Sequence, residues 1–357
     1  MEKQRDLLFL CLVLSCSSSF LPWVSSSEGG LEKVSPQRLF VFGDSYADTG
    51  NTEKLSGGWH PPYGSTFPGE PSGRFSDGLV LTDYVASFLG IESPQPYTWR
   101  NDVNKTLLQH GMNFAFGGTG VFDTMAREPN MTTQIDYFQS SVEQNVYTKH
   151  DLSSSVALVS LAGNDYAAFT MKNGNQEELP SFITSVIDQL VYNLKRIKGL
   201  GVGKIAVTAL EPLGCLPQIT TVSSFKNCSS NWNSITRLHN HQLRRSLQEL
   251  KKNESMMGPS SPSSSSALVI LDLHSAFVSA LNMLRHQSGN LSENPLKPCC
   301  VGVTEGYSCG NVGDKGVKNY VLCNHPETSF FWDNIHPSQN GWHAVYSFLH
   351  SSLHRLL

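Results

Sequence analysis

Short apolar runs that end in small or polar residues recur along this chain. The first is residues 39–42, and Gly43-Asp44-Ser45 follows it directly. Continuous apolar runs of this length are typical of strands buried on both faces. Gly, Asp and Ser are typical of turns and helix caps. Ser45 is therefore expected at the carboxyl end of a parallel strand, where open α/β sheets bind ligands. Similar runs predict further strands at 112–116, 156–161, 204–210 and 267–273.

Segments with helical spacing of apolar residues alternate with these strands. The most regular is 178–198, which Gly199 and Gly201 bring to an end. The same spacing predicts helices at 77–89, 133–147, 231–252, 274–285 and 338–353. This alternation favours an α/β fold with a parallel sheet covered on both faces.

The chain opens with the pattern of a secretory signal peptide. Lys3 and Arg5 precede an apolar run at 7–14, and a Ser-rich stretch follows as far as Ser27. The run is interrupted before it reaches the ~18 to 20 apolar residues that a membrane anchor requires, and no later stretch comes close. We predict a signal peptide at 1–27, one domain at 28–357, a secreted protein and no integral membrane segment in the mature chain.

The Gly-Pro-Ser tract at 258–266 is the only low-complexity segment of the predicted mature chain. It has the composition of a domain linker. Strand and helix signals of one kind lie on both sides of it, however. A long surface loop within one domain is the better interpretation.

Charge and cysteine content narrow the classes of function. A net charge of -4 gives no reason to expect a nucleic-acid partner. Six cysteines follow the predicted signal peptide, and an even number in an exported chain favours disulfides. No Cys-x-x-Cys pair occurs among them, which argues against a zinc site. We expect neither metal nor cofactor; the cysteines are Cys215, Cys228, Cys299, Cys300, Cys309 and Cys323.

Asn-x-Ser/Thr sequons are consistent with passage through a glycosylating secretory pathway. They predict loops or helix ends that face water. The candidate glycosylation sites are Asn104, Asn130, Asn227, Asn253 and Asn290.

Asp333 and His336 lie three residues apart in a polar turn before the last predicted helix. A serine hydroxyl becomes a nucleophile when a neutral imidazole removes its proton, and His336 can serve Ser45 in this way. A carboxylate must orient that imidazole and stabilise its charged form, and Asp333 is the nearest candidate. Together these residue types predict a Ser-His-Asp triad.

An oxyanion formed at the substrate carbonyl requires fixed hydrogen-bond donors. Asn164 follows the strand predicted at 156–161, and Gly117 and Gly118 follow the one at 112–116. The Asn164 amide, a glycine N–H and the Ser45 N–H are therefore candidate donors at the same sheet edge. The alternative for Ser45 and Asn164 is ordinary helix capping.

Four sequence blocks, taken in order, resemble those of the GDSL esterase/lipases, or SGNH hydrolases. They begin at Gly43, Asn113, Gly163 and Asp333, and read GDSYADTGN, NFAFGG, GND and DNIHP. The likeness covers nearly all of the predicted mature chain and is closest to secreted plant members, through the stretches GRFSDG at 73–78 and PLGCLP at 212–217. No Gly-x-Ser-x-Gly elbow surrounds Ser45, which argues against the α/β-hydrolase fold.

The resemblance implies a flavodoxin-like three-layer fold with a central parallel sheet of about five strands. It implies Ser45 as nucleophile with His336 and Asp333 as its partners, and Asn164 and a glycine as oxyanion donors. Either Gly117 or Gly118 can be aligned with the family glycine; we place Gly117 first.

We predict a secreted hydrolase of small-molecule or lipid carboxylic esters that works through an acyl-enzyme. An acyltransferase on the same fold and a catalytically silent protein that binds lipid or glycan esters are the alternatives. The oligomeric state is left open.

Overall fold

The structure, a computed structural model, describes residues 36–161, 163–256, 268–287 and 294–357. The predicted signal peptide, the sequon at Asn290 and the Gly-Pro-Ser tract lie outside these residues. Among the described residues, no helix is both long and apolar enough to cross a bilayer.

A six-stranded sheet in the order β2-β3-β1-β4-β5-β6 forms the centre of the fold. Every neighbouring pair in it is parallel. Without the two-residue β2 the order is that of flavodoxin, and the ligand-binding switch point then falls between β1 and β4. The strands are β1 (Arg38–Gly43), β2 (Gln95–Pro96), β3 (Gly111–Asn113), β4 (Ser155–Ser160), β5 (Lys204–Ala209) and β6 (Leu268–Asp272).

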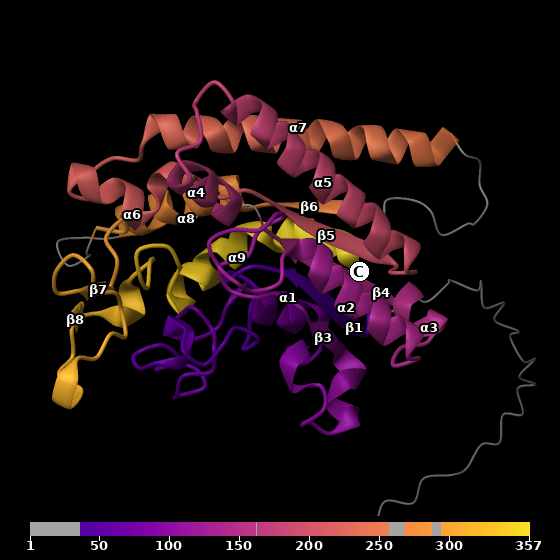
Figure 1. Cartoon of the computed structure of the whole chain (residues 1–357), viewed down its shortest axis with the longest axis horizontal. Coiled ribbons are helices and arrows are strands. Elements are labelled where there is room, and N and C mark those ends of the chain that lie inside the picture. The colour runs from indigo at the N-terminus through magenta and orange to yellow at the C-terminus, as the bar shows by residue number, and fades with distance from the viewer. Residues whose placement is uncertain (1–35, 162, 257–267, 288–293) are drawn as a thin grey trace, which may run out of the picture. The chain divides into compact units, whose positions relative to one another are not determined.

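Two groups of helices cover the sheet and give the three-layer α/β fold. In one group α1 and α8 pack on α9, and in the other α2 and α7 pack on α5. Figure 1 shows α5 and α7 running along one side of the strands. The helices are α1 (Leu81–Leu89), α2 (Met131–Glu143), α3 (Lys149–Ser153), α4 (Gly163–Met171), α5 (Leu179–Gly199), α6 (Pro217–Thr220), α7 (Ser230–Met256), α8 (Leu273–Gln287) and α9 (Gln339–Leu353).

The apolar runs form the strands because both of their faces are covered. Every residue of β4 is buried, and so are five of the six residues of β1. Phe40 and Phe42 of β1 pack on Phe138 of α2, with ring centroids 4.7 and 5.5 Å apart. This packing holds the carboxyl end of β1 firmly at the edge where Ser45 follows.

Three differences from the predicted elements have local causes. The strand predicted at 112–116 ends at Asn113, although Phe114 and Phe116 still donate backbone hydrogen bonds to β1. The helix predicted from residue 77 begins at Leu81, because the Asp77 side chain accepts the Gln339 N–H and ties this segment to α9. Helix α4 was not predicted, since it starts directly after β4 and lacks a strongly apolar face.

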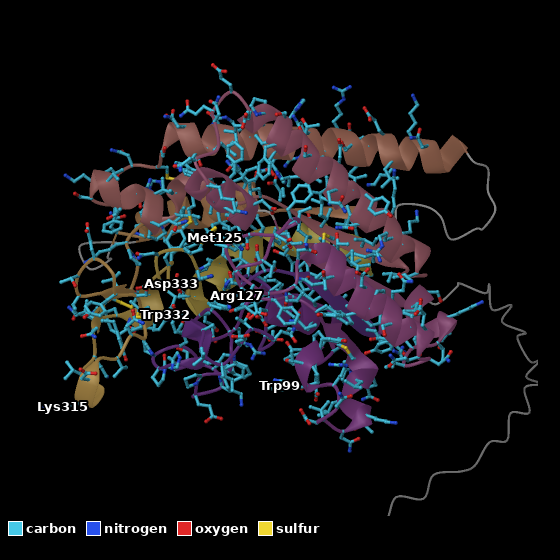
Figure 2. All side chains as sticks on the ribbon, viewed as in Figure 1. Trp99, Met125, Arg127, Lys315, Trp332 and Asp333 are labelled. Carbon is cyan, nitrogen blue, oxygen red and sulfur yellow. A yellow bond between two sulfur atoms is a disulfide. The ribbon has the colours of Figure 1, made fainter. Side chains whose placement is uncertain are left out.

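A small lobe near the C-terminus is cross-linked as the cysteine count predicted. Its antiparallel strands are β7 (Cys300–Gly302) and β8 (Tyr320–Leu322), and its disulfides are Cys299–Cys323 and Cys300–Cys309. A third disulfide, Cys215–Cys228, lies elsewhere in the chain. Figure 2 places Lys315 at the tip of the lobe and Asp333 beside Trp332 toward the body.

Candidate active site

The three predicted catalytic side chains meet at the carboxyl end of β1. His336 Nε2 lies 2.8 Å from Ser45 Oγ, and His336 Nδ1 lies 2.8 Å from Asp333 Oδ2. The relative exposures of Ser45, Asp333 and His336 are 7%, 8% and 7%, so only a small part of each residue faces solvent. This arrangement suits removal of a proton from the serine hydroxyl.

A tight turn presents Asp333 and His336 together. Asp333 Oδ1 accepts the backbone N–H groups of Ile335 and His336, both at 2.8 Å. Trp332 N–H donates to the His336 carbonyl at 2.8 Å and closes the turn, and Ser338 then caps α9. The three-residue spacing seen in the sequence therefore forms an Asp-centred turn, as such spacing favours.

The Asp333 carboxylate fixes which nitrogen of His336 carries the proton. Burial raises the pKa of Asp333, but the charge of His336 and hydrogen bonds from His336 and Tyr63 outweigh it and lower this pKa overall. An ionised carboxylate can only accept, so Nδ1 donates to it. Nε2 is then left to accept the Ser45 hydroxyl proton.

Tyr63 is a buried neighbour of the triad, and the sequence predicted no contact between it and Asp333. Its hydroxyl donates to Asp333 Oδ2 at 2.6 Å. Burial, and then the charge of Asp333, raise the pKa of Tyr63, so the phenol stays protonated and can donate. Phe75 packs against the imidazole of His336, with ring centroids 5.1 Å apart. Part of the aromatic loop at 59–75 thus supports the triad.

We expect Tyr63→Phe to lower kcat for ester hydrolysis by roughly 10-fold with little change in KM, because one charge-assisted hydrogen bond to Asp333 is lost. That bond lowers the pKa of Asp333, so its removal should shift the acidic limb of the kcat–pH profile to higher pH. Steady-state kinetics across pH measures both effects. Tyr307→Phe, at an exposed position in the lobe, is the control. An unshifted profile with normal kcat would contradict the positioning role.

The turn after β1 holds Ser45 without using its hydroxyl. Asp44 Oδ1 accepts the Tyr46 N–H at 3.0 Å, and the Asp44 carbonyl accepts the Ala47 N–H at 3.0 Å. Within the described residues no helix begins at Ser45, and its Oγ bonds to His336. The helix-capping alternative for Ser45 is therefore not what the structure contains.

Asp48 connects this turn to the segment that follows β3. Its carboxylate accepts the N–H groups of Gly50, Asn51, Thr52 and Gly117, as well as the Thr52 hydroxyl. The sequence suggested turn and cap chemistry for Asp48. Its reach across to Gly117 makes it the centre of a larger network.

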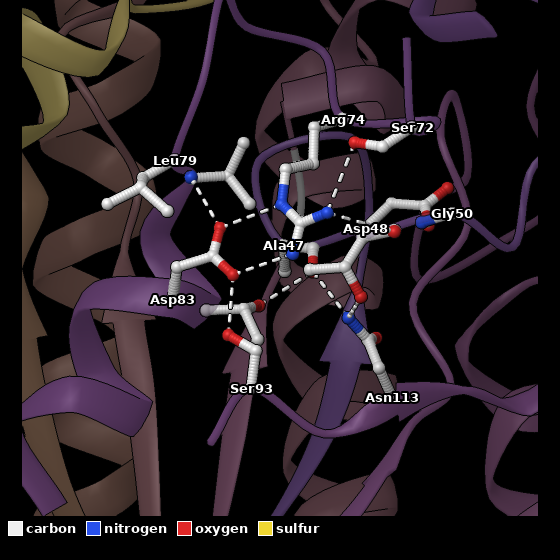
Figure 3. Close-up of polar contacts among 12 residues, drawn as sticks. Ala47, Asp48, Gly50, Ser72, Arg74, Leu79, Asp83, Ser93 and Asn113 are labelled. Carbon is white, nitrogen blue, oxygen red and sulfur yellow. Dashed lines mark hydrogen bonds and ion pairs between the residues drawn. The ribbon is translucent and has the colours of Figure 1, made fainter. Parts of the chain in front are cut away.

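The outer part of this network is an ion pair between Arg74 and Asp83. Arg74 Nη2 lies 2.8 Å from Asp83 Oδ1, and Arg74 Nη1 also donates to Ser72 at 3.2 Å. Figure 3 shows these groups around Ala47 and Asp48, with the Asn113 amide donating to the Ala47 carbonyl. Several chain segments thus fix the backbone just beyond Ser45.

We expect Asp48→Asn to lower the free energy of unfolding by roughly 2 to 4 kcal/mol, because an amide NH₂ would face backbone donors now paired with a carboxylate oxygen. Urea unfolding followed by circular dichroism measures this change. Asp188→Asn, at an exposed position on α5, should stay within about 0.5 kcal/mol of the parent protein. Equal stability of the two variants would refute the role of Asp48.

The two candidate glycines have different surroundings. The Gly117 N–H donates to Asp48 Oδ2 at 3.0 Å and to Thr52 Oγ1 at 2.6 Å, so it is engaged behind the site. Gly118 has φ of +78° and lines the cavity beside Ser45 and Asn164. The prediction placed Gly117 first among the oxyanion donors, but in this structure its N–H is already engaged, so Gly118 is the better candidate.

Asn164 lies at the start of α4, on the β4 side of the switch point. Its Nδ2 donates to the Thr119 carbonyl at 2.9 Å, which orients the amide and occupies one of its two N–H groups. The next residue, Asp165, accepts the N–H groups of Val121 and Phe122 at 2.9 Å each. The segment at 119–122 and the start of α4 are thereby fixed to one another next to Ser45.

A cavity of about 300 Å³ opens beside these groups. Ser45, Gly118 and Asn164 line it. None of the residues 59–75, all of which the structure describes, lines this cavity. Most of its wall is apolar and comes from Met125, Ala126, Ala167, Ala168, Met171, Leu213, Leu216, Ile219, Trp232 and Ile335.

Glu211 is a second carboxyl group at this cavity and was not predicted. Burial raises the pKa of Glu211 from 4.5 to about 7, against smaller lowering contributions from its own N–H and from His336. The folded protein therefore keeps the Glu211 proton at pH values where the unfolded chain has lost it. The stability that Glu211 contributes is complete below pH 4.5 and declines as the pH rises through about 7.

At 1.36 kcal/mol for each pH unit between 4.5 and about 7, this loss amounts to about 3 kcal/mol. Glu211→Gln cannot ionise. We expect its free energy of unfolding, relative to the parent protein, to rise by about that amount between pH 4.5 and pH 8. Urea unfolding at both pH values tests this, with exposed Glu177→Gln as control. A pH-independent difference would contradict the assignment.

Residues 39–349 match the family described as GDSL-like lipase/acylhydrolase. The chain belongs to this family. It is 49% identical to the GDSL esterase/lipase At5g03610 of Arabidopsis thaliana, over 97% of this chain and 96% of that protein. It is also 49% identical to the GDSL esterase/lipase At3g09930 of the same plant, over 97% of each chain. As a member of the family, it is a carboxylic ester hydrolase.

Among solved structures, an α/β hydrolase named LAE5, from the metagenome of Lake Arreo, aligns with 90% of this chain and 96% of its own. The TM-score is 0.39 and the sequence identity 13%.

Proposed function

We propose that the protein hydrolyses carboxylic esters through an acyl-enzyme on Ser45. The contact that carries this proposal is the 2.8 Å approach of His336 Nε2 to Ser45 Oγ, with Asp333 on the other ring nitrogen. His336 removes the hydroxyl proton while Ser45 Oγ attacks the ester carbonyl carbon. Asp333 orients the ring and stabilises the imidazolium.

The negative oxygen of the tetrahedral intermediate then requires donors. In our proposal these are the backbone N–H groups of Ser45 and Gly118 and the second N–H of the Asn164 amide, since all three residues line the cavity. Collapse of the intermediate breaks the ester C–O bond, and His336 returns the proton to the leaving alcohol. Water attacks the acyl-enzyme by the same steps and releases the acid.

We also propose that the protein is secreted and glycosylated. Three disulfides in the described part of the chain are consistent with an oxidising compartment. Asn104, Asn227 and Asn253 are exposed, and Asn130 is half-buried at the start of α2, so these sequons are open to modification. Small-molecule or lipid esters are the substrates that we propose.

The experiment is an assay of the purified full chain on short-chain p-nitrophenyl esters, together with labelling by a fluorophosphonate probe. We expect turnover, and a single probe adduct that peptide mass spectrometry locates on Ser45. Turnover with the adduct on another residue would exclude Ser45 as nucleophile. No turnover and no adduct across acyl chain lengths would refute the proposed function.

A further inference from the structure

Glu211 holds a carboxyl group at the cavity beside the nucleophile. It follows β5 by two residues, at the same sheet edge as Ser45 and Asn164. Its residue exposure is 7%, and it belongs to the cavity wall together with Asp44 and Gly163. A Cβ atom built on Gly163 would lie 3.1 Å from Glu211 Oε1, so the carboxyl group reaches the first residue of α4.

The backbone of Glu211 is held without help from its side chain. Asn240 of α7 exchanges two hydrogen bonds with the backbone of Leu210, at 2.7 and 2.9 Å. Thr236 donates to the Glu211 carbonyl at 3.1 Å. Both α7 side chains are buried. A structural task for the carboxyl group is thus not evident, because its segment is already fixed.

The Glu211 carboxyl group has no side-chain hydrogen-bond partner among the described residues, and its own backbone N–H is the donor beside it. No lysine or arginine of the described chain lines the cavity. The charged or titratable groups that act on it or are acted on by it are Asp44, Tyr46 and His336. A buried carboxyl group without a hydrogen-bond partner lowers the free energy of unfolding, unless a ligand supplies the partner.

The lining of the cavity suits the acyl group better than the leaving alcohol. His336 must return its proton to the leaving oxygen, so the alcohol lies on the His336 side of Ser45. His336 does not line the cavity, whereas Ser45, Gly118 and Asn164 do. An acyl group attached to Ser45 would therefore extend from the oxyanion donors into this cavity, whose lining includes Glu211.

We propose that Glu211 is a specificity-determining residue that selects acyl groups carrying a hydroxyl. This inference rests on the proposed function, because it takes Ser45 as the point of acyl attachment. A substrate hydroxyl both donates and accepts, so it can pair with the carboxyl group in either protonation state. An unsubstituted fatty acyl group would leave the carboxyl group buried without a partner.

A hydroxyl fits this site better than an ammonium group. Burial raises the pKa of Glu211 to about 7, so its carboxyl group is mostly protonated in mildly acidic solution and about half ionised at neutral pH. An ammonium group would require the ionised carboxylate and would bring a second charge into a mostly apolar cavity. A neutral hydroxyl avoids both costs.

The test compares kcat/KM for ethyl hexanoate, its β-hydroxy and ω-hydroxy analogues and its ω-amino analogue, followed by pH-stat titration of the full chain. We expect at least one hydroxyacyl ester to be preferred over ethyl hexanoate by about 10-fold or more. Glu211→Leu should bring that ratio to about 1 or below, and Glu211→Gln should retain part of it, because an amide also donates and accepts.

Glu249→Leu is the matched control, because it removes an exposed carboxyl group on α7 and should leave the ratio unchanged. Thermal unfolding shows whether each variant folds. If Glu211→Leu does not fold, the comparison is made with Glu211→Gln alone. An unchanged ratio in folded Glu211 variants, or a stronger preference for the aminoacyl ester, would overturn the proposal.

Binding of the same esters to Ser45→Ala, measured by calorimetry, separates this inference from the proposed function. A hydroxyl preference in binding that disappears with Glu211→Leu supports the role of Glu211 even if hydrolysis turns out not to depend on Ser45. Normal hydrolysis by the parent protein without any Glu211-dependent preference overturns the role of Glu211 and leaves the proposed function intact.

Discussion

Ser45→Ala should lower kcat for p-nitrophenyl ester hydrolysis by about 10⁶-fold, to the level that binding and the oxyanion donors alone can sustain. The substitution removes the atom that attacks the carbonyl, and His336 Nε2 then has no hydroxyl to deprotonate at 2.8 Å. Folding should be unaffected, because the described structure uses this hydroxyl only for its contact with His336. Steady-state and burst kinetics with a far-ultraviolet circular dichroism spectrum measure both expectations.

Ser87→Ala is the control for this variant, since Ser87 is an exposed serine on α1. It should keep the kcat of the parent protein. If Ser45→Ala retained more than about a thousandth of that activity after repurification, a nucleophile other than Ser45 would have to be sought.

Asp333→Asn should lower kcat by about 10⁴-fold with a smaller effect on KM. The amide NH₂ cannot accept a hydrogen bond from Nδ1–H of His336. It therefore either repels this N–H or favours the tautomer in which Nδ1 carries no proton. In that tautomer Nε2 carries a proton and cannot accept the Ser45 hydroxyl. The Tyr63 hydroxyl, which donates to Asp333 at 2.6 Å, would also lose part of its acceptor.

The kcat–pH profile distinguishes this mechanism from general loss of structure. Asp333→Asn should regain activity toward high pH, where hydroxide replaces the missing base, while its far-ultraviolet circular dichroism spectrum stays that of the folded parent protein. Asp314→Asn, at an exposed position in the C-terminal lobe, is the matched control. A loss of less than about 10-fold would mean that Asp333 does not orient His336.

The strands of the sheet could be predicted from the sequence where the apolar pattern of one short segment was enough to identify the strand. The buried runs of β1, β4, β5 and β6 are continuous and apolar, so each reveals its strand. Strand β2 could not be predicted, because it is two residues long and contains Pro96. Its pairing depends on β3 being in place and not on any local pattern.

In the candidate site, too, some residues could be predicted from short stretches of sequence and others could not. Asp333 and His336 are close in sequence, and the motif blocks made Ser45 and Asn164 candidates. The choice between Gly117 and Gly118 depends on the Asp48 carboxylate, which lies 69 residues from Gly117 and occupies its N–H. Tyr63 reaches Asp333 across 270 residues, and no local pattern announces such a contact. Glu211 was missed for a similar reason, because an isolated glutamate carries no signal of burial.

The contact between His336 and Ser45 spans 291 residues and joins the first strand of the fold to the turn before its last helix. A ribosome adds about 5 to 20 residues each second, so Ser45 emerges many seconds before its base. Under the proposed mechanism, the nascent chain would therefore be catalytically inert until His336 has left the ribosome and docked against Ser45. Ester hydrolysis in a translation extract would then report, in real time, the completion of folding.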